Sequence, residues 1–521
     1  MSKSLQHIFP LCSKFLPESF WQDDLVHAEP GDMPRLITDS PLQEQTEDFL
    51  PDLARIELAR YQLKKSGTVE SLARGEACQV NPGLVLVQVH WQPLLTLLEG
   101  GEVNPQPGIQ RLLFWRHPRT GKEHEEQATP ADLLALKIVA EQLNPETIAR
   151  ETEQPVGAID AILDRAIKRG LLIAPPSGLR RNLPNFSAHG MTPEEYRVAE
   201  TFTLQWHITH NCDLHCRHCY DRSLRDDVSL EQGLEILDQM RTFCRRQQVG
   251  GQVSFSGGNP FLHPDFTQLY RAAHERNLNL AILGNPVSES QLEQVLQIAR
   301  PAFYQVSLEG LQEHNDLIRG QGSFASVLSF LDLLREKQVY SMVMLTLTRA
   351  NLDQVLPLAE ILRDRVDLFT FNRLAMVGEG ANLETPGSIE YEAFIGKYLQ
   401  ARKHNPAMAL KDNLINIKLE QDKQGLFGGC TGYGCGAAFN FVSLLPDGQV
   451  HACRKFPSPI GDINHQSLAE IYFSAVAGAY RNGCRECAEC RLRAICGGCL
   501  AVAYGCGLDP LKKKDPGCFL Q

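Results

Sequence analysis

Apolar, strand-like runs alternate with amphipathic helical stretches through the middle of the chain, between residues 201 and 380. The strand-like runs are 202–209, 252–255, 278–283, 303–308, 342–347 and 368–374. The helical patterns between them are 229–247, 264–276, 289–298, 324–337 and 351–362. Alternation of this kind predicts a parallel sheet with right-handed crossovers. We therefore expect an α/β fold of six strand–helix units over this part of the chain.

The preceding residues have two different patterns. Apolar positions recur at helical intervals within 1–75, at Leu50, Leu53, Ile56, Ala59 and Leu63. Residues 76–176 instead read as strands at 84–90, 111–115 and 123–127 followed by three short helices. We expect a helical N-terminal extension, then a small α+β module, and then a linker over 177–200 that begins near a Pro-Pro-Ser-Gly run.

Composition and charge limit the functions that fit. The 521 residues carry 51 Lys and Arg against 62 Asp and Glu, a net charge of −11, which disfavours nucleic acid as the main partner. No run approaches the roughly 20 apolar residues that span a bilayer, and no signal peptide is evident. We expect a cytoplasmic protein without a membrane partner, whose 16 cysteines serve mostly as metal ligands rather than in disulfides.

Three cysteines follow directly on the first strand of the α/β segment: Cys212, Cys216 and Cys219. Three thiolates can hold three irons of a 4Fe–4S cube and leave the fourth iron open for a small molecule. Half of a zinc site or a group of core thiols are the alternatives, although zinc sites usually show paired Cys-x2-Cys knuckles.

This spacing, with Tyr220 directly after the last cysteine, resembles the signature of the radical S-adenosylmethionine (radical SAM) enzymes. The resemblance implies a partial (β/α)6 barrel whose ligands collect at the carboxyl ends of the strands. It also implies that the three cysteines are catalytic: the open iron chelates S-adenosylmethionine, and reductive cleavage gives a 5′-deoxyadenosyl radical that abstracts hydrogen.

A glycine pair after the second strand, Gly257-Gly258 in Ser-Gly-Gly-Asn-Pro, resembles the family's Gly-Gly-Glu-Pro motif, with Asn259 in place of Glu. By itself the pair also fits a plain strand–turn. The resemblance also places Ser307, Glu309 and Arg319 at the cofactor, and Asn285 is a further, weaker pocket candidate because it follows the third strand. The alternatives to a role at the cofactor are a solvated strand end for Glu309 and a surface salt bridge for Arg319.

The remaining cysteines gather after residue 429, beyond the expected connecting helices of 381–429. They are Cys430, Cys435, Cys453, Cys484, Cys487, Cys490, Cys496, Cys499, Cys506 and Cys518. Zinc knuckles are one interpretation, but the number of thiols exceeds two zinc sites.

The order of these cysteines resembles the SPASM extension, which would span 430–521 and hold two auxiliary 4Fe–4S clusters. Motif matching assigns to the nearer cluster Cys430, Cys435, Cys453 and Cys499, and to the outer cluster Cys487, Cys490, Cys496 and Cys518. The Cys496-x2-Cys499 spacing departs from the family's x3. Cys484 and Cys506 are left over, as substitute ligands or catalytic thiols.

Strands followed by three helices over 76–176 resemble the RiPP recognition element, the module also found as the free-standing chaperone of pyrroloquinoline quinone synthesis. The resemblance implies that the leader of a precursor peptide adds as a strand to a sheet edge. A winged-helix DNA binder shares this layout, but acidic residues on the helices, such as Glu146 and Glu151, disfavour DNA.

The order of the three modules resembles maturases of ribosomally made peptides, including those of the selenobiotic type. It implies an oxidoreductase-type enzyme that forms a thioether or another crosslink in a precursor peptide and takes electrons from a donor such as flavodoxin or ferredoxin. Two alternatives stay open: a formylglycine maturase of sulfatases, and a leader-binding iron–sulfur scaffold without catalysis. Arg454 counts against the first, because those maturases carry an acidic base there.

Overall fold

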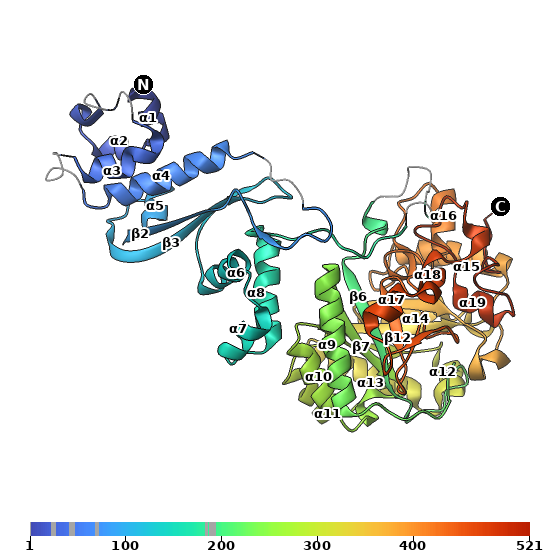
Figure 1. Cartoon of the computed structure of the whole chain (residues 1–521). Coiled ribbons are helices and arrows are strands. Elements are labelled where there is room, and N and C mark those ends of the chain that lie inside the picture. Colours follow the sequence, from blue (N-terminus) through green and yellow to red (C-terminus); the bar gives the residue numbers. More distant parts are fainter. Residues whose placement is uncertain are drawn as a thin grey trace. The chain divides into compact units, whose positions relative to one another are not determined.

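The computed structural model describes residues 2–21, 25, 28–40, 47–67, 72–182, 186 and 194–520. The chain divides into two compact units, Met1–Pro176 and Ser177–Gln521 (Figure 1). The middle of the predicted linker, at 183–185 and 187–193, lies outside the described residues. Within the described ranges, no helix is both long and apolar enough to cross a bilayer.

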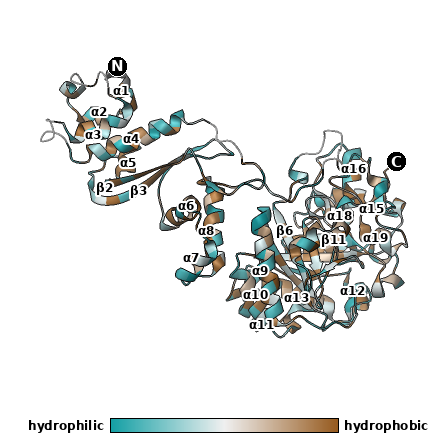
Figure 2. Ribbon diagram, in the orientation of Figure 1, coloured by the Kyte–Doolittle hydropathy of each residue, from teal (hydrophilic) through white to brown (hydrophobic). Residues whose placement is uncertain are grey.

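The first unit is built on an antiparallel sheet of order β2-β3-β4. Its strands are β2 (Val85–Gln92), β3 (Gln106–Arg116) and β4 (Glu123–Gln127). Successive residues of a strand point to opposite faces, and β3 buries both: Leu112 and Phe114 enter one hydrophobic core, Leu113 and Trp115 the other. Figure 2 shows the apolar colour concentrated on β2 and β3, between layers of helices.

Helices cover each face of this sheet. On the Leu112 face pack α1 (Ser2–Ile8), α2 (Cys12–Phe15), α3 (Met33–Thr38), α4 (Leu50–Lys65) and α5 (Leu94–Leu98). On the Leu113 face pack α6 (Pro130–Ala140), α7 (Pro145–Glu151) and α8 (Val156–Arg169). The predicted helical extension therefore shares a core with the sheet, and β1 (Gln79–Val80) pairs with β5 (Leu172–Ile173) beside the second layer.

Local signals place the boundaries of the last three helices. Thr129 caps α6 through the backbone N–H of Asp132, and Asn144 caps α7. Gly170 adopts a left-handed conformation (φ 76°) that ends α8.

The second unit contains a nine-stranded sheet of order β11-β10-β9-β8-β7-β6-β12-β13-β14. Its parallel part is β6 (Thr201–Thr209), β7 (Gly250–Gly257), β8 (Asn279–Leu283), β9 (Phe303–Ser307), β10 (Ser341–Leu347) and β11 (Leu368–Arg373). The helices between these strands are α9 (Leu230–Gln247), α10 (Phe266–His274), α11 (Glu289–Leu296), α12 (Gln312–Arg319), α13 (Ser323–Glu336) and α14 (Val355–Leu362). The six predicted strands are confirmed.

Three further strands extend the same sheet from the cysteine-rich end: β12 (Phe441–Leu444), β13 (Gln449–His451) and β14 (Pro459–Asp462). β12 pairs in parallel with β6, with Phe441 opposite Thr203. The other helices are α15 (Ser388–Arg402), α16 (Ile415–Gln421), α17 (Leu468–Phe473), α18 (Ala475–Asn482) and α19 (Leu500–Gly505). The cysteine-rich segment is thus joined edge to edge to the first barrel strand.

The barrel strands separate apolar from polar side chains. On β7, Val253 and Phe255 belong to the main hydrophobic core, whereas Ser254 and Ser256 point to the other face and are also buried. The inner face of this strand therefore offers hydrogen-bonding groups rather than close apolar packing. The carboxyl end of β6 leads from this polar interior directly into the loop that carries the cysteine triplet.

Candidate active site and cluster sites

The cysteine triplet lies in the loop between β6 and α9. The loop is held from outside by a hydrogen bond from Arg217 N to Ile318 O of 2.9 Å, and within the triplet Cys219 N donates to Cys216 O at 3.1 Å. Cys212 is exposed, while Cys216 and Cys219 are half-buried. The three thiols are therefore presented on one short, turned segment at the mouth of the barrel.

The thiols share one electrostatic environment. Burial raises the pKa of Cys216, Arg319 lowers it, and Glu309, Cys212 and Cys219 raise it further. Burial likewise raises the pKa of Cys219, with a contribution from Cys212. Several buried thiolates in one place need positive charge, which the irons of a cluster supply.

The glycine pair supports this loop directly. Gly258 N donates to Thr209 O at 2.8 Å, and the next residue, Asn259, donates its N–H to Asn211 O at 2.8 Å. A Cβ on Gly257 would lie 2.1 Å from Thr209 O, and one on Gly258 would lie 2.0 Å from Asn211 O. Gly257 also has a φ of 119°, which side chains disfavour. Both glycines are thus required for the close approach of β7 to the start of the cysteine loop.

Replacing Gly258 with alanine should push Asn211, and with it Cys212, away from β7. A displacement of about 1 Å at a reacting centre costs roughly a hundredfold in rate, so we expect a loss of that order in S-adenosylmethionine cleavage, with less iron at the first cluster. Iron analysis and 5′-deoxyadenosine formation measure the two effects. Gly425→Ala is the control, because nothing lies within 4 Å of a Cβ there. Equal activity of the two variants would contradict this role.

A buried polar chain connects the triplet to three of the residues predicted at the cofactor. Asn285 Nδ2 lies 2.5 Å from Asp213 Oδ1 and 3.6 Å from Cys212 Sγ. Arg319 donates through Nη2 to Asn285 Oδ1 at 3.1 Å and through Nη1 to Glu309 Oε1 at 3.3 Å. The structure therefore brings Asn285, Glu309 and Arg319 together beside the cysteines.

Glu309 is buried and contacts several members of this series of polar side chains. Its side chain is 2% exposed, its Oε1 lies 3.4 Å from His218 Nε2, and its Oε2 accepts from Thr346 N at 2.8 Å. Burial lowers the pKa of His218. Among the residues that the structure describes, Arg319 has no hydrogen-bond partner for its buried Nε, which is a donor suited to the carboxylate of a bound cofactor. Ser307 ends β9 half-buried, but its side chain makes no hydrogen bond to the chain within the described part of the protein.

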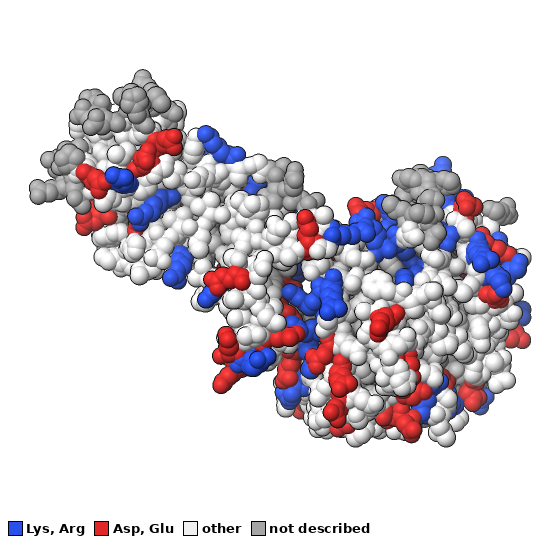
Figure 3. Space-filling model, viewed as in Figure 1, with Lys and Arg blue, Asp and Glu red and all other residues white. Residues whose placement is uncertain are grey.

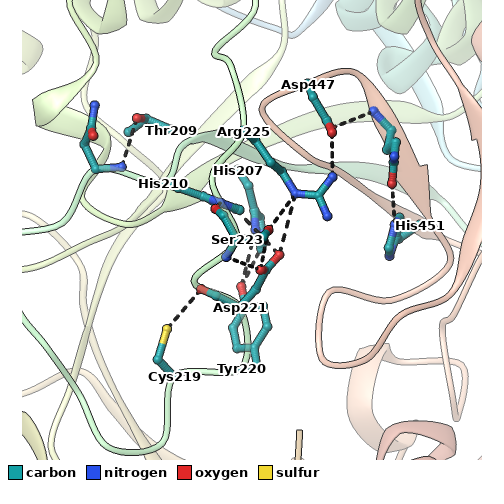
Figure 4. Close-up of polar contacts among 12 residues, drawn as sticks. His207, Thr209, His210, Cys219, Tyr220, Asp221, Ser223, Arg225, Asp447 and His451 are labelled. Atoms are coloured by element: carbon teal, nitrogen blue, oxygen red, sulfur yellow. Dashed lines mark hydrogen bonds and ion pairs between the residues drawn. The ribbon is translucent and has the colours of Figure 1, made fainter. Parts of the chain in front are cut away.

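Tyr220 points its hydroxyl at the imidazole of His207 on β6, at 3.2 Å from Nε2 (Figure 4). Burial lowers the pKa of His207 well below its ordinary value, and Arg454 lowers it further. Burial raises the pKa of Tyr220. At neutral pH the pair is a neutral imidazole and a protonated phenol. The sequence analysis missed His207, because a single histidine in an apolar strand gives no distinct signal.

The cysteine-rich segment reaches the barrel mouth through charged side chains. Arg225, in the triplet loop, binds Asp447 of the β12–β13 turn with Nη1 at 2.5 Å from Oδ2 (Figure 4). Arg454, which follows Cys453, places Nη1 at 3.5 Å from Ser256 Oγ at the end of β7. The permanently charged guanidinium of Arg454 therefore faces the polar interior of the barrel. A formylglycine maturase would carry its acidic base at this position of the sequence.

The four cysteines predicted at the nearer auxiliary cluster lie together. Burial raises the pKa of Cys435 to about 12, and the neighbouring thiols Cys499, Cys453 and Cys430 contribute to that rise. Burial and the thiols of Cys499 and Cys430 raise the pKa of Cys453 to about 11. Four half-buried thiols in one place fit a cluster, because their thiolates would repel one another without iron.

The outer set also lies together, with an additional thiol beside it. Cys487, Cys490, Cys496 and Cys518 line one cavity. Burial is the main cause that raises the pKa of Cys487 to about 12, and the neighbouring thiols of Cys484, Cys490 and Cys518 raise it further. Cys484 is therefore a fifth thiol at this site. The other spare cysteine, Cys506, is half-buried near Asp515 and Arg373 instead.

No three His, Cys, Asp or Glu side chains in the described ranges converge closely enough to hold a single metal ion. A 4Fe–4S cube does not require such convergence, because each thiolate binds a different iron. The three thiol groups, at the triplet and in the two C-terminal sets, fit this wider arrangement.

Comparison with known families identifies both iron–sulfur segments. Residues 206–362 match the Radical SAM superfamily, and residues 435–499 match the SPASM iron–sulfur cluster-binding domain. The α/β fold with a radical SAM domain and a C-terminal SPASM domain is thereby confirmed. Domains of these kinds bind 4Fe–4S clusters, and radical SAM domains use S-adenosylmethionine.

The chain is also similar to several characterised proteins. It is 23% identical over 353 residues to Fe-coproporphyrin III synthase of Methanosarcina barkeri, covering 60% of this chain and 87% of that one. It is 26% identical over 335 residues to mycofactocin maturase MftC of Mycolicibacterium smegmatis (60% and 82% covered). It is 24% identical over 312 residues to the subtilosin biosynthesis protein AlbA of Bacillus subtilis (56% and 65% covered).

Among solved structures, Streptococcus suis SuiB bound to the precursor peptide SuiA has a similar fold. Its TM-score is 0.51 at 16% identity, covering 79% of this chain and 96% of SuiB. At this identity the likeness concerns the fold.

Proposed function

We propose that this chain, which carries a radical SAM domain and a SPASM domain, modifies a ribosomally made precursor peptide by radical chemistry. The observation that carries the proposal is the grouping of the cysteine triplet, the Gly257–Gly258 support and the Arg319–Glu309–Asn285 chain at one barrel mouth, beside two further thiol sets. Relatives that mature mycofactocin and subtilosin support a peptide substrate.

Cys212, Cys216 and Cys219 would hold the first cluster, and Arg319 would bind the carboxylate of S-adenosylmethionine. When bound, the cluster and S-adenosylmethionine supply a 5′-deoxyadenosyl radical that removes a hydrogen atom from a C–H bond. Buried Glu309 and Asn285 orient the Arg319 guanidinium from two sides. Tyr220 stays protonated against His207, so it adds no charge beside the cysteines.

The first unit would bind the leader of the peptide as a RiPP recognition element. Strand β4 pairs only with β3 in the described sheet, so its other edge is available for strand addition. Its carboxylates already have arginine partners: Glu123 with Arg116, Glu125 with Arg60, and Glu126 with Arg169. Main-chain groups are therefore the main binding feature of this edge.

Two cross-strand bonds indicate which β4 amides face outward. Ala128 N donates to Arg111 O, and His117 N donates to Lys122 O. The even-numbered residues of β4 therefore form the hydrogen-bonded pairs with β3. The N–H of Glu125 then points to the free edge.

The product would be a thioether or another crosslink. For a thioether, the peptide loses one hydrogen atom from a C–H bond and one proton from a thiol, a carbon–sulfur bond forms, and one electron leaves to an oxidised iron–sulfur centre. A donor such as flavodoxin or ferredoxin would supply the electron that starts each turnover. Acidic and basic side chains are mixed on the visible face (Figure 3), and the net charge is −11, which supports a peptide rather than a nucleic-acid partner.

The test is anaerobic incubation of the reconstituted full chain with dithionite, S-adenosylmethionine and the short peptides encoded beside its gene. We expect 5′-deoxyadenosine together with a peptide that has lost two hydrogens and one alkylatable thiol. Glu125→Pro should weaken peptide modification but not cleavage of S-adenosylmethionine without peptide, because proline removes the outward N–H. Glu125→Ala, which loses the same ion pair, is the matched control.

Other outcomes identify the rivals. A sulfatase peptide converted to formylglycine would establish the formylglycine maturase, which Arg454 disfavours. Conversion of an iron porphyrin without change in any peptide would establish an activity like that of the coproporphyrin synthase relative. Absence of 5′-deoxyadenosine with all clusters assembled would leave a leader-binding scaffold.

A further inference from the structure

Arg181 is a buried cation that the cofactor site does not use. It is 5% exposed and lies in the second unit, just before the undescribed part of the linker. Its Nη2 donates to Tyr433 O at 2.8 Å and Cys435 O at 2.5 Å, and its Nη1 donates to Arg481 O at 2.8 Å. Within the described ranges, its Nε is buried without a hydrogen-bond partner. The acceptors that the structure describes for Arg181 are all carbonyl oxygens, so no carboxylate among those residues neutralises its charge.

Two more guanidinium groups share this environment. Arg493 is 9% exposed and donates to Asn482 O, and Arg481 donates to Ala438 O at 3.1 Å. Arg181 and Arg493 lie over the same ring, Phe186, at 4.9 and 4.8 Å from its centroid. Within the part of the chain that the structure describes, none of these three arginines forms an ion pair with a carboxylate.

These arginines repel one another. Burial lowers the pKa of Arg181 to about 10, Cys435 and Tyr472 oppose that shift, and Arg481 and Arg493 add to it. Buried like charges without anions are unfavourable, so the folded protein must place negative charge close by.

The two proposed auxiliary clusters are in the right place to supply that charge. Arg181 binds the main chain of Cys435 in the nearer set, while Arg493 N donates to Cys490 O at 3.0 Å in the outer set. The Arg493 charge also interacts with the thiols of Cys487 and Cys484, with the carboxylate of Glu489, and with the thiol of Cys490. A 4Fe–4S cluster with four thiolates is a dianion when oxidised and a trianion after reduction by one electron.

We infer that Arg181, Arg481 and Arg493 are the built-in counter-charge of the two auxiliary clusters, with Arg181 raising the reduction potential of the nearer cluster and Arg493 that of the outer one. A fixed cation stabilises the trianion more than the dianion, so it favours uptake of an electron. The three are positioning residues for electron transfer. This inference rests on the cluster ligands assigned under the proposed function.

The test is a potentiometric titration with dithionite, followed by electron paramagnetic resonance, of the reconstituted full chain. Cys212, Cys216 and Cys219 are replaced with alanine in this background to remove the first cluster. Arg181→Gln should move one of the two reduction steps to more negative potential, and Arg493→Gln the other. At the potential where the parent cluster is half reduced, we expect the ratio of reduced to oxidised cluster to fall by roughly tenfold, the scale of one charge at an effective dielectric constant of about 20.

Matched controls lie next to each residue. Arg180 pairs with Glu194, and Arg491 pairs with Glu420 on the surface, so Arg180→Gln and Arg491→Gln should leave both steps in place. If the Arg181 and Arg493 variants titrate like these controls with full iron content, the inference is wrong.

Loss of iron is also informative. If Arg181→Gln loses the nearer cluster and Arg181→Lys keeps it, the positive charge is required, as inferred. If both lose it, Arg181 acts through packing and the counter-charge role is excluded. A parent without auxiliary iron refutes the cluster assignment itself, whereas intact clusters with unchanged peptides refute only the substrate.

Discussion

Replacing Cys216 with alanine is expected to reduce 5′-deoxyadenosine formation from S-adenosylmethionine to the level seen without protein. Its thiol is half-buried and lies among Cys212, Cys219, Arg319 and Glu309, and the alanine side chain offers no ligand atom in its place. With two thiolates left, the first cluster should not persist, whereas both auxiliary sets keep all of their cysteines.

The measurement combines 5′-deoxyadenosine analysis with iron and sulfide content, which should fall by about one cluster of three. Cys244→Ala is the control: burial in α9 raises the pKa of this thiol to about 12, and no other thiol contributes to the shift. Full cleavage activity in the Cys216 variant would remove the basis of the radical SAM mechanism.

Replacing Asp515 with alanine is expected to cause the largest loss of stability, about 3–5 kcal/mol, because it leaves a buried arginine without its main anion. Arg373, at the end of β11, donates to Asp515 Oδ1 at 2.8 Å and Oδ2 at 2.5 Å, and to Asp412 Oδ2 at 2.9 Å. The Arg373 and Asp515 side chains are 4% and 2% exposed. Asp515 also accepts from Cys499 N at 2.8 Å, so its loss should weaken the nearer cluster as well.

Urea unfolding of the anaerobic protein, followed by circular dichroism, measures this effect. Asp509→Ala is the matched control, since its partner Lys512 is exposed and such a pair contributes about 0–1 kcal/mol. Burial alone would raise the pKa of Asp515, but Arg373 and two backbone N–H groups bring it below its ordinary value. The contribution of Asp515 is therefore present above the unfolded pKa of about 3.9 and lost as the pH falls through the lower folded value. Equal stability of the two variants would show that Arg373 finds another partner.

Repeating patterns within short segments carried most of the fold prediction. The six barrel strands, β4 and the cap of α6 at Thr129 follow from periodicity and from capping and turn residues that act over a few positions. The pairing of β12 with β6 was not predicted, because Phe441 and Thr203 lie far apart in the chain. Sheet neighbours are chosen by long-range packing, which a local pattern does not contain.

The candidate site divides in the same way. Spacing alone pointed to the triplet, because ligand type and short separations are present in the sequence. The glycine pair and the two C-terminal cysteine sets were predicted from their resemblance to the radical SAM and SPASM motifs. Spacing could not show that Asn285 contacts both Asp213 and Arg319, or that His207 meets Tyr220, because these partners come from different strands and loops.

The order of residues was enough to indicate iron–sulfur radical chemistry in an α/β barrel, because thiolates and glycines at those separations suit few other uses. Folding alone decided the electrostatics around that chemistry. Arg181 looks like an ordinary surface residue in the sequence, and it becomes a buried cation beside Cys435 only once segments far apart in the chain pack together. Arg493 already follows Cys490 closely in the sequence, but its burial depends on the same packing. Burial removes water from a charge, and which groups then surround it depends on contacts between segments that the linear order leaves open.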